Sequence, residues 1–277
     1  MQLGDDRTVR NTSLASAISI RDRGSLITGG LLVAFALLAW LGVVRQTVNM
    51  SAGMPGDAAD YTSILGMTWF LAGWGVMMAA MMLPSATPMM LVYRQLSLRN
   101  SEPGARTIRL VTFVGVYLVI WLGFGVFVYL AGWLLRVAID ADPAIADRVP
   151  YALAVVLVVA GLYQFSPLKR ACLRSCRSPL SFLMGRWRPG RLASAQLATA
   201  HALYCVGCCA ALMVVLVAAG AMSLSWVLLI AAIVFIEKLL PQGDVSSRVV
   251  GAGLIVLGLA VAANPDLAAM LRGVSLM

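Results

Sequence analysis

The sequence predicts an all-α protein, a polytopic bundle of about seven transmembrane helices with a cytoplasmic N-terminus and an external C-terminus. Hydrophobic residues make up 61% of the 277-residue chain and charged residues only 12%. Soluble domains carry about 25% charged residues, roughly twice this share. Several apolar runs are also long enough to cross the hydrocarbon core of a bilayer. These observations exclude an ordinary soluble enzyme or binding domain.

Seven apolar runs are predicted to be spans. The first run exceeds the apolar region of a signal peptide, so we expect it to remain as an uncleaved span. The expected organisation is a cytoplasmic tail over residues 1–24, a single transmembrane domain over 25–264 and a short tail over 265–277. The predicted spans are 25–44, 66–92, 109–135, 151–166, 195–219, 225–240 and 249–264.

The basic residues set the predicted orientation. With the N-terminus inside, seventeen Lys and Arg residues fall on cytoplasmic segments and four on external ones. Such a bias marks the cytoplasmic side of membrane proteins. The net charge of +9 is then a property of the cytoplasmic face, where it attracts anionic lipid headgroups. We therefore expect a bilayer partner and no nucleic acid.

The fifth predicted span carries an unusual set of polar side chains. It contains the single histidine, His201, and three of the five cysteines, Cys205, Cys208 and Cys209. At about 100° per residue, all four fall on one face of a helix. Thiolate and imidazole suit soft or borderline metals, which makes copper the favoured ion and zinc the alternative. Because His201 and Cys209 lie roughly 12 Å apart along the helix, we expect successive sites rather than one.

The remaining cysteines, Cys172 and Cys176, lie in a basic segment that we place in the cytoplasm, where thiols stay reduced. Their spacing puts them on one helix face, and the adjacent arginines are expected to lower their pKa values. This pattern predicts a site for metal capture or release. The alternative is a basic amphipathic stretch on anionic headgroups. Whether the segment folds back to the cysteines of the fifth span stays open.

The second predicted span is rich in methionine and interrupted by proline. Met78, Met81 and Met82 offer thioether ligands and precede Pro84 and Pro88. The two prolines are expected to kink or break the helix, and broken membrane helices often mark ion or substrate sites. Methionine also fills irregular gaps between helices, so metal binding and packing both remain open.

Glu237 and Lys238, at the inner end of the sixth predicted span, allow two interpretations. They form either a plain interfacial pair or a group that binds a cation or carries a proton. The sequence contains no catalytic Ser/His/Asp pattern, phosphate-binding loop or dinucleotide-binding motif. No catalytic residue is therefore predicted.

Four short motifs follow one another along the chain. They are Met-Met-Ala-Ala-Met-Met-Leu-Pro at 77–84, Pro-Leu-Lys-x-x-Cys-Leu-x-x-Cys-Arg-x-Pro at 167–179, His-x-x-x-Cys-x-Gly-Cys-Cys at 201–209 and Glu-Lys-x-x-Pro at 237–241. In this order they resemble a bacterial family of uncharacterised integral membrane proteins regarded as metal-binding. The chain departs from the family in having Ala202 where glycine is frequent and Ala210 where tryptophan is frequent. The resemblance implies a multi-pass protein of the bacterial inner membrane that binds a metal ion.

The predicted function is the handling or movement of a soft metal ion, copper before zinc, within the inner membrane. A partner membrane protein or a metallochaperone is expected to exchange the metal. Two alternatives stay open. One is an accessory or assembly subunit of a membrane complex, and the other is a thiol–disulfide redox protein that uses Cys205 and Cys208.

Overall fold

The computed structural model describes residues 23–51, 63–98, 103–186, 192–220, 223–240 and 242–271, and every element within these ranges is a helix. Most of the predicted N-terminal tail, the last six residues of the predicted C-terminal tail and residues 52–62 lie outside the described residues. The helices are α2 (Arg23–Ser51), α3 (Ile64–Leu98), α4 (Pro103–Ala141), α5 (Ala144–Gln164), α6 (Pro167–Arg177), α7 (Pro179–Arg186), α8 (Ala193–Gly220), α9 (Leu224–Leu239), α10 (Gly243–Ala263) and α11 (Asp266–Leu271).

Six of these helices, α2, α3, α4, α5, α8 and α10, are long and apolar enough to cross a membrane. The described part of the chain is therefore all-helical and has the helices of a multi-pass membrane protein, and six of the seven predicted spans coincide with helices of spanning length. The predicted span 225–240 forms α9, but its 16 residues are fewer than the roughly 20 that a spanning helix needs. Its 16 residues rise only about 24 Å at about 1.5 Å each.

Several helices extend well beyond the predicted spans. Hydropathy detects only the apolar part of a helix, whereas the backbone hydrogen bonds continue into polar flanks. The segment between the predicted spans 109–135 and 151–166 is therefore mostly helical. Helix α4 runs on to Ala141 and α5 begins at Ala144, which leaves Asp142 and Pro143 between them.

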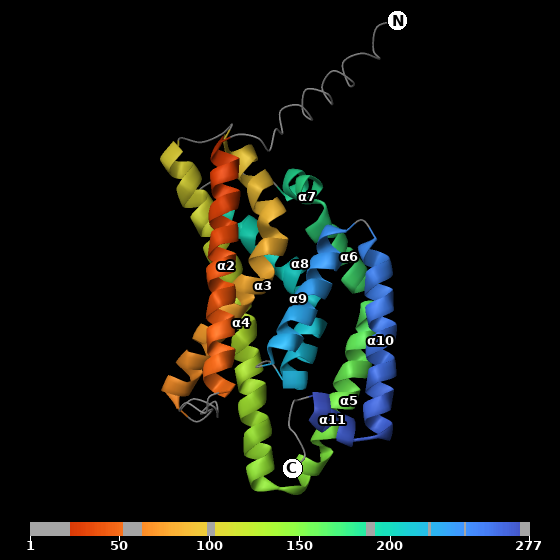
Figure 1. Cartoon of the computed structure of the whole chain (residues 1–277). Coiled ribbons are helices and arrows are strands. Elements are labelled where there is room, and N and C mark those ends of the chain that lie inside the picture. The colour runs from red at the N-terminus through yellow and green to blue at the C-terminus, as the bar shows by residue number, and fades with distance from the viewer. Residues whose placement is uncertain are drawn as a thin grey trace, which may run out of the picture.

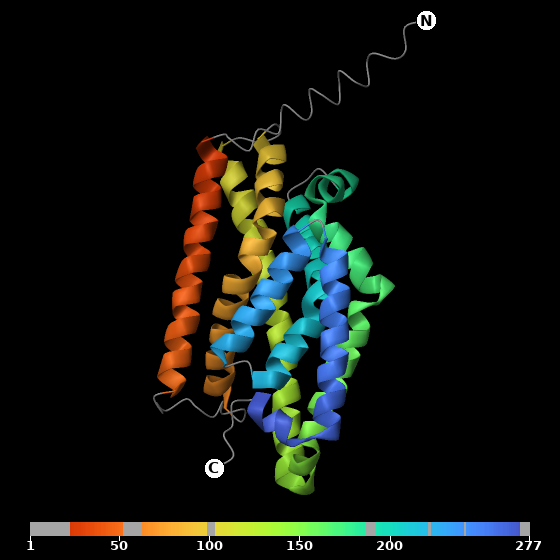
Figure 2. The ribbon, with the colours of Figure 1, turned by 45° about the vertical axis from the view of Figure 1, so that its right-hand side comes forward.

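The helices form an elongated bundle in which α10 ends opposite the end where α2 begins (Figure 1). Helix α2 lies at one edge, and the pair α5 and α10 lies toward the other (Figure 2). On α2, the side chains of Leu31 and Leu38 are each 66% exposed, as expected for a surface covered by lipid. Helix α8 is the most enclosed span, with half of its most apolar window buried.

Helices α5 and α10 pack closely through glycine. A Cβ atom on Gly251 would lie 2.8 Å from the Gln164 Cβ and 2.9 Å from the Gly161 carbonyl oxygen. A Cβ atom on Gly161 would meet the Gly251 carbonyl oxygen at 2.7 Å. Small residues of this kind allow membrane helices to approach backbone to backbone.

Replacing Gly251 by leucine is expected to lower the free energy of unfolding by about 3 kcal/mol, the upper end for overpacking a tight interface. The matched control is Gly253→Leu, because Gly253 lies on the exposed face of the same helix with nothing within 4 Å of its Cβ position. Thermal unfolding in detergent would measure both variants. Equal losses of stability would contradict the close α5–α10 packing.

Helix α3 passes through Pro84 and Pro88 without a break, so the part of the prediction that allowed a broken helix is wrong. Two side-chain hydroxyl groups donate hydrogen bonds to backbone carbonyls in this region. Ser85 Oγ donates to the Met82 carbonyl at 2.9 Å and Thr87 Oγ1 donates to the Leu83 carbonyl at 2.9 Å. The surrounding helices bury this stretch of α3, which holds it in a helical path despite two missing backbone donors.

Candidate metal centre

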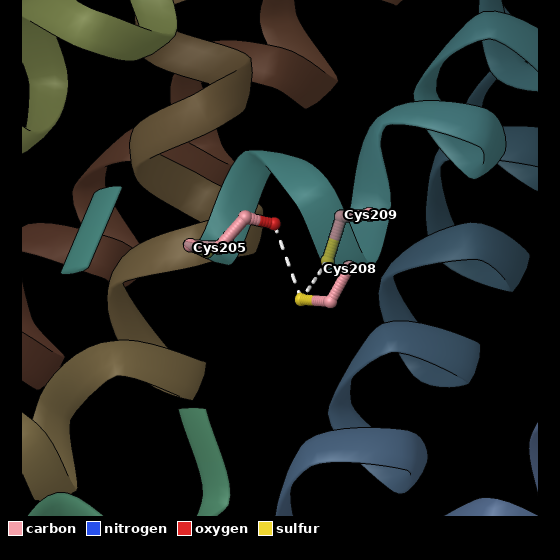
Figure 3. Close-up of side chains that lie close together, drawn as sticks. All are labelled: Cys205, Cys208 and Cys209. Carbon is pink, nitrogen blue, oxygen red and sulfur yellow. Dashed lines mark hydrogen bonds between the residues drawn. The ribbon is translucent and has the colours of Figure 1, made fainter. Parts of the chain in front are cut away.

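Three thiols of α8 form a buried cluster. The Sγ atoms of Cys205, Cys208 and Cys209 all lie within 4.8 Å of one another, and each residue is 1% exposed. Figure 3 shows Cys208 pointing back toward Cys205, where its thiol donates to the Cys205 carbonyl at 3.1 Å. The Cys208 and Cys209 sulfurs are 3.3 Å apart. Three soft donors from one helix thus converge.

Helix α6 starts with two local signals. Ser166 is its N-cap and accepts a hydrogen bond from the Lys169 backbone N–H at 3.1 Å, while Pro167 occupies the first helical position. Serine caps and first-position prolines are preferred at such starts. One face of the helix then carries the buried residues Lys169, Cys172 and Leu173, and α6 packs against α8 (Figure 1).

The packing of α6 brings its cysteines to the α8 thiols, which answers the question that the sequence left open. The Cys176 sulfur lies 3.9 Å from the Cys208 sulfur. Gly207 makes this approach possible, because a Cβ atom there would lie 2.7 Å from the Cys172 sulfur. We call the four residues Cys176, Cys205, Cys208 and Cys209 the thiol cluster.

The predicted effect of the arginines on the α6 thiols is wrong. Burial raises the pKa of Cys172, and a hydrogen bond with the Cys205 sulfur raises the pKa of Cys176. Arg170 and Arg174 point to the exposed side of the helix, where solvent screens their charges. Neither thiol is therefore shifted toward the thiolate by its surroundings.

Three side chains that the sequence did not assign to the site surround Cys205. Lys238 Nζ donates to the Cys205 sulfur at 2.9 Å and to Ser85 Oγ at 3.2 Å. The Tyr117 hydroxyl lies 3.0 Å from the same sulfur. Ser85 comes from α3, Tyr117 from α4 and Lys238 from α9, so four helices meet at Cys205.

The predicted methionines are buried, and Met82 reaches the edge of the site. Its Sδ atom lies 3.9 Å from Lys238 Nζ. Met78 and Met81 lie in the same helix, at 0% and 3% exposure. The structure thus brings Met82 next to the thiol cluster and places Met78 and Met81 in the core of the bundle.

Glu237 is neither at an exposed interface nor paired with its neighbour Lys238. Its Oε2 atom accepts from Lys169 Nζ at 2.7 Å, and both side chains are at most 2% exposed. Lys169 also donates to Gln164 Oε1. This ion pair joins α6 to α9 and fixes the position of α6 beside the cluster.

His201 lies next to the cluster but outside the group of converging thiols. It is 2% exposed, and neither ring nitrogen has a hydrogen-bond partner. Its ring packs against Phe113, Tyr117 and Phe182, with centroids 6.0, 5.7 and 5.8 Å away. Tyr117 therefore contacts both His201 and Cys205. The imidazole is a candidate metal ligand that lies apart from the converging thiols.

The fold and the site define a multi-pass membrane protein with a buried thiol group able to hold a metal ion. Residues 71–261, more than half of the chain, match the protein family described as PpoB2, copper chaperone. The chain belongs to this family. The matched range includes α6, α8, α9 and the methionine-rich part of α3. No curated protein and no solved structure matches the chain.

Proposed function

We propose that the protein is a membrane copper chaperone, which binds Cu(I) in its thiol cluster and passes the ion to a partner protein. The observation that carries this proposal is the meeting of Cys176 on α6 with Cys205, Cys208 and Cys209 on α8. Thiolates and thioethers are the ligands that favour Cu(I), and Met82 adds a thioether nearby. The family to which the chain belongs supports copper as the cargo.

The site suits ligand exchange better than permanent storage. It contains more sulfur atoms than a single Cu(I) ion requires, so the ion can move between neighbouring thiols. Cys172 and Cys176 lie on a helix outside the six spanning helices and form the point of capture or release. His201 offers a further ligand one turn before Cys205, if the imidazole turns toward the metal.

The orientation and location of the protein belong to the same proposal. The bias of the basic residues places α6 and α7 on the cytoplasmic side of a bacterial inner membrane. Arg170, Arg174 and Arg186 are exposed there and contact anionic headgroups. The partner is a membrane protein or a soluble metallochaperone that presents its own thiols to Cys172 and Cys176.

The test is the metal content of the full-length protein, purified in detergent after expression with copper and zinc both supplied. We expect about one copper per chain in the wild type and none in the triple variant Cys205→Ala, Cys208→Ala, Cys209→Ala. Circular dichroism and gel filtration would verify that both proteins are folded. Negligible metal in both proteins would contradict the proposal, and zinc in place of copper would make the protein a zinc carrier.

The assembly and redox alternatives give different results in the same preparation. A thiol–disulfide protein would show reversible loss of labelled thiols in the absence of metal, for example through the Cys176–Cys208 pair. An assembly subunit without a metal role would bind its partner equally well with and without the three cysteines. A copper chaperone loses both the metal and the transfer to a Cu(I) chelator in the triple variant.

A further inference from the structure

The buried charges of the described chain leave one cation without a carboxylate. Its buried charged residues are Lys169, Glu237 and Lys238. Lys169 and Glu237 form an ion pair at 2.7 Å, and their charges cancel. Lys238, 6% exposed, remains. A buried ammonium group is strongly disfavoured unless an anion lies beside it.

The neighbour of Lys238 that can carry a negative charge is the sulfur atom of Cys205. Its Nζ atom lies 2.9 Å from the Cys205 sulfur, 3.2 Å from Ser85 Oγ and 3.9 Å from Met82 Sδ. Ser85 and Met82 carry no charge, so of these three contacts only the Cys205 sulfur can be anionic, as it is when it binds a metal ion. The Tyr117 hydroxyl lies 3.0 Å from the same sulfur.

We propose that Lys238 is the fixed counter-cation of the copper–thiolate unit. A Cu(I) ion held by two thiolates carries one negative charge, and burial of that charge requires a neighbouring cation. Lys238 provides it without leaving the Cys205 sulfur, because one sulfur can bind a metal and accept hydrogen bonds together. When copper leaves, the ammonium stays beside the Cys205 sulfur, 2.9 Å away. This inference rests on the proposed copper function.

The test compares Cu(I) affinities of the full chain in detergent by anaerobic competition with bicinchoninate. Lys238→Met is expected to weaken binding by about 10–100-fold, the usual loss when a partner behind a metal ligand is removed. Lys238→Arg keeps the charge and is expected to restore most of the affinity. Arg174→Met is the matched control, since it removes one exposed positive charge from α6 and should leave the affinity unchanged.

A second neutral variant covers the case in which Lys238→Met does not fold. Lys238→Gln retains a donor for Ser85 and Cys205 but carries no charge, and the same loss of affinity is expected. X-ray absorption should show unchanged sulfur ligation of the bound copper in the Lys238 variants, which a merely misfolded site would not give. Wild-type or tighter affinity in a folded neutral variant would overturn the proposal. Such a result would leave the copper function intact, because that function is tested by the triple cysteine variant.

Discussion

Replacing Cys208 by serine is expected to weaken Cu(I) binding by more than about 100-fold. Loss of a residue that hydrogen-bonds to a metal ligand already lowers metal affinity by about 10–100-fold. Cys208 is itself a proposed ligand and lies at the centre of the thiol cluster. Its sulfur is 3.3 Å from that of Cys209 and 3.9 Å from that of Cys176. Serine has nearly the same size but offers a hard oxygen, which Cu(I) disfavours. Competition titration with bicinchoninate under reducing, anaerobic conditions gives the affinity.

Cys172→Ser is the comparison for this experiment. The Cys172 sulfur lies against the Gly207 backbone and outside the group of three converging α8 thiols. We expect its loss to cost less than about tenfold, the lower end for partners behind a metal ligand. Similar losses for the two variants would contradict the central role of Cys208.

Replacing Lys169 by methionine is expected to lower the free energy of unfolding by about 3–5 kcal/mol. Removal of one member of a buried ion pair leaves the other charge uncompensated, and effects of this size follow. Lys169 and Glu237 are both 1% exposed and lie 2.7 Å apart. Because the pair also joins α6 to α9, the variant is expected to bind Cu(I) more weakly. Thermal unfolding in detergent measures the stability.

The double variant Lys169→Met, Glu237→Met separates the charge from the packing. Replacement of both members of a buried pair by apolar residues is often neutral, so most of the lost stability should return. Equal destabilisation in the single and double variants would show that the ion pair does not determine the stability of this region.

The sequence was sufficient for features that lie within one helix. Cys205, Cys208 and Cys209 are close in sequence, so helical periodicity alone placed them on one face. The six long spans follow in the same way from the length of their apolar runs. The extent of α9 was predicted to within one residue at each end, since the predicted span 225–240 became Leu224–Leu239. The error was to count an apolar run of 16 residues as a span, because about 20 are needed to cross the hydrocarbon core.

Features that depend on contacts between distant helices could not be predicted. The fold-back of α6 is accompanied by the Lys169–Glu237 pair, whose members are 68 positions apart, and by the small Gly207 opposite Cys172. For Glu237 and Lys238 the sequence left an interfacial pair and a functional group equally open, and it gave no sign that Lys238 contacts Cys205. The sequence did contain one signal that two of these positions are special. Lys169 and Lys238 are the only lysines in a chain with 21 basic residues.

The shortness of α9 bears on the depth of the candidate metal centre in the membrane. Its rise of about 24 Å is roughly 6 Å less than the hydrocarbon thickness of a bilayer. Lipid that covers the exposed face of α9 would therefore have to thin, or let headgroups approach, at one end of the helix. Glu237 and Lys238 lie in the last turn of α9, but the bundle buries both side chains. Such thinning would shorten the path from the bilayer surface to the candidate metal centre, while protein rather than water surrounds Lys238.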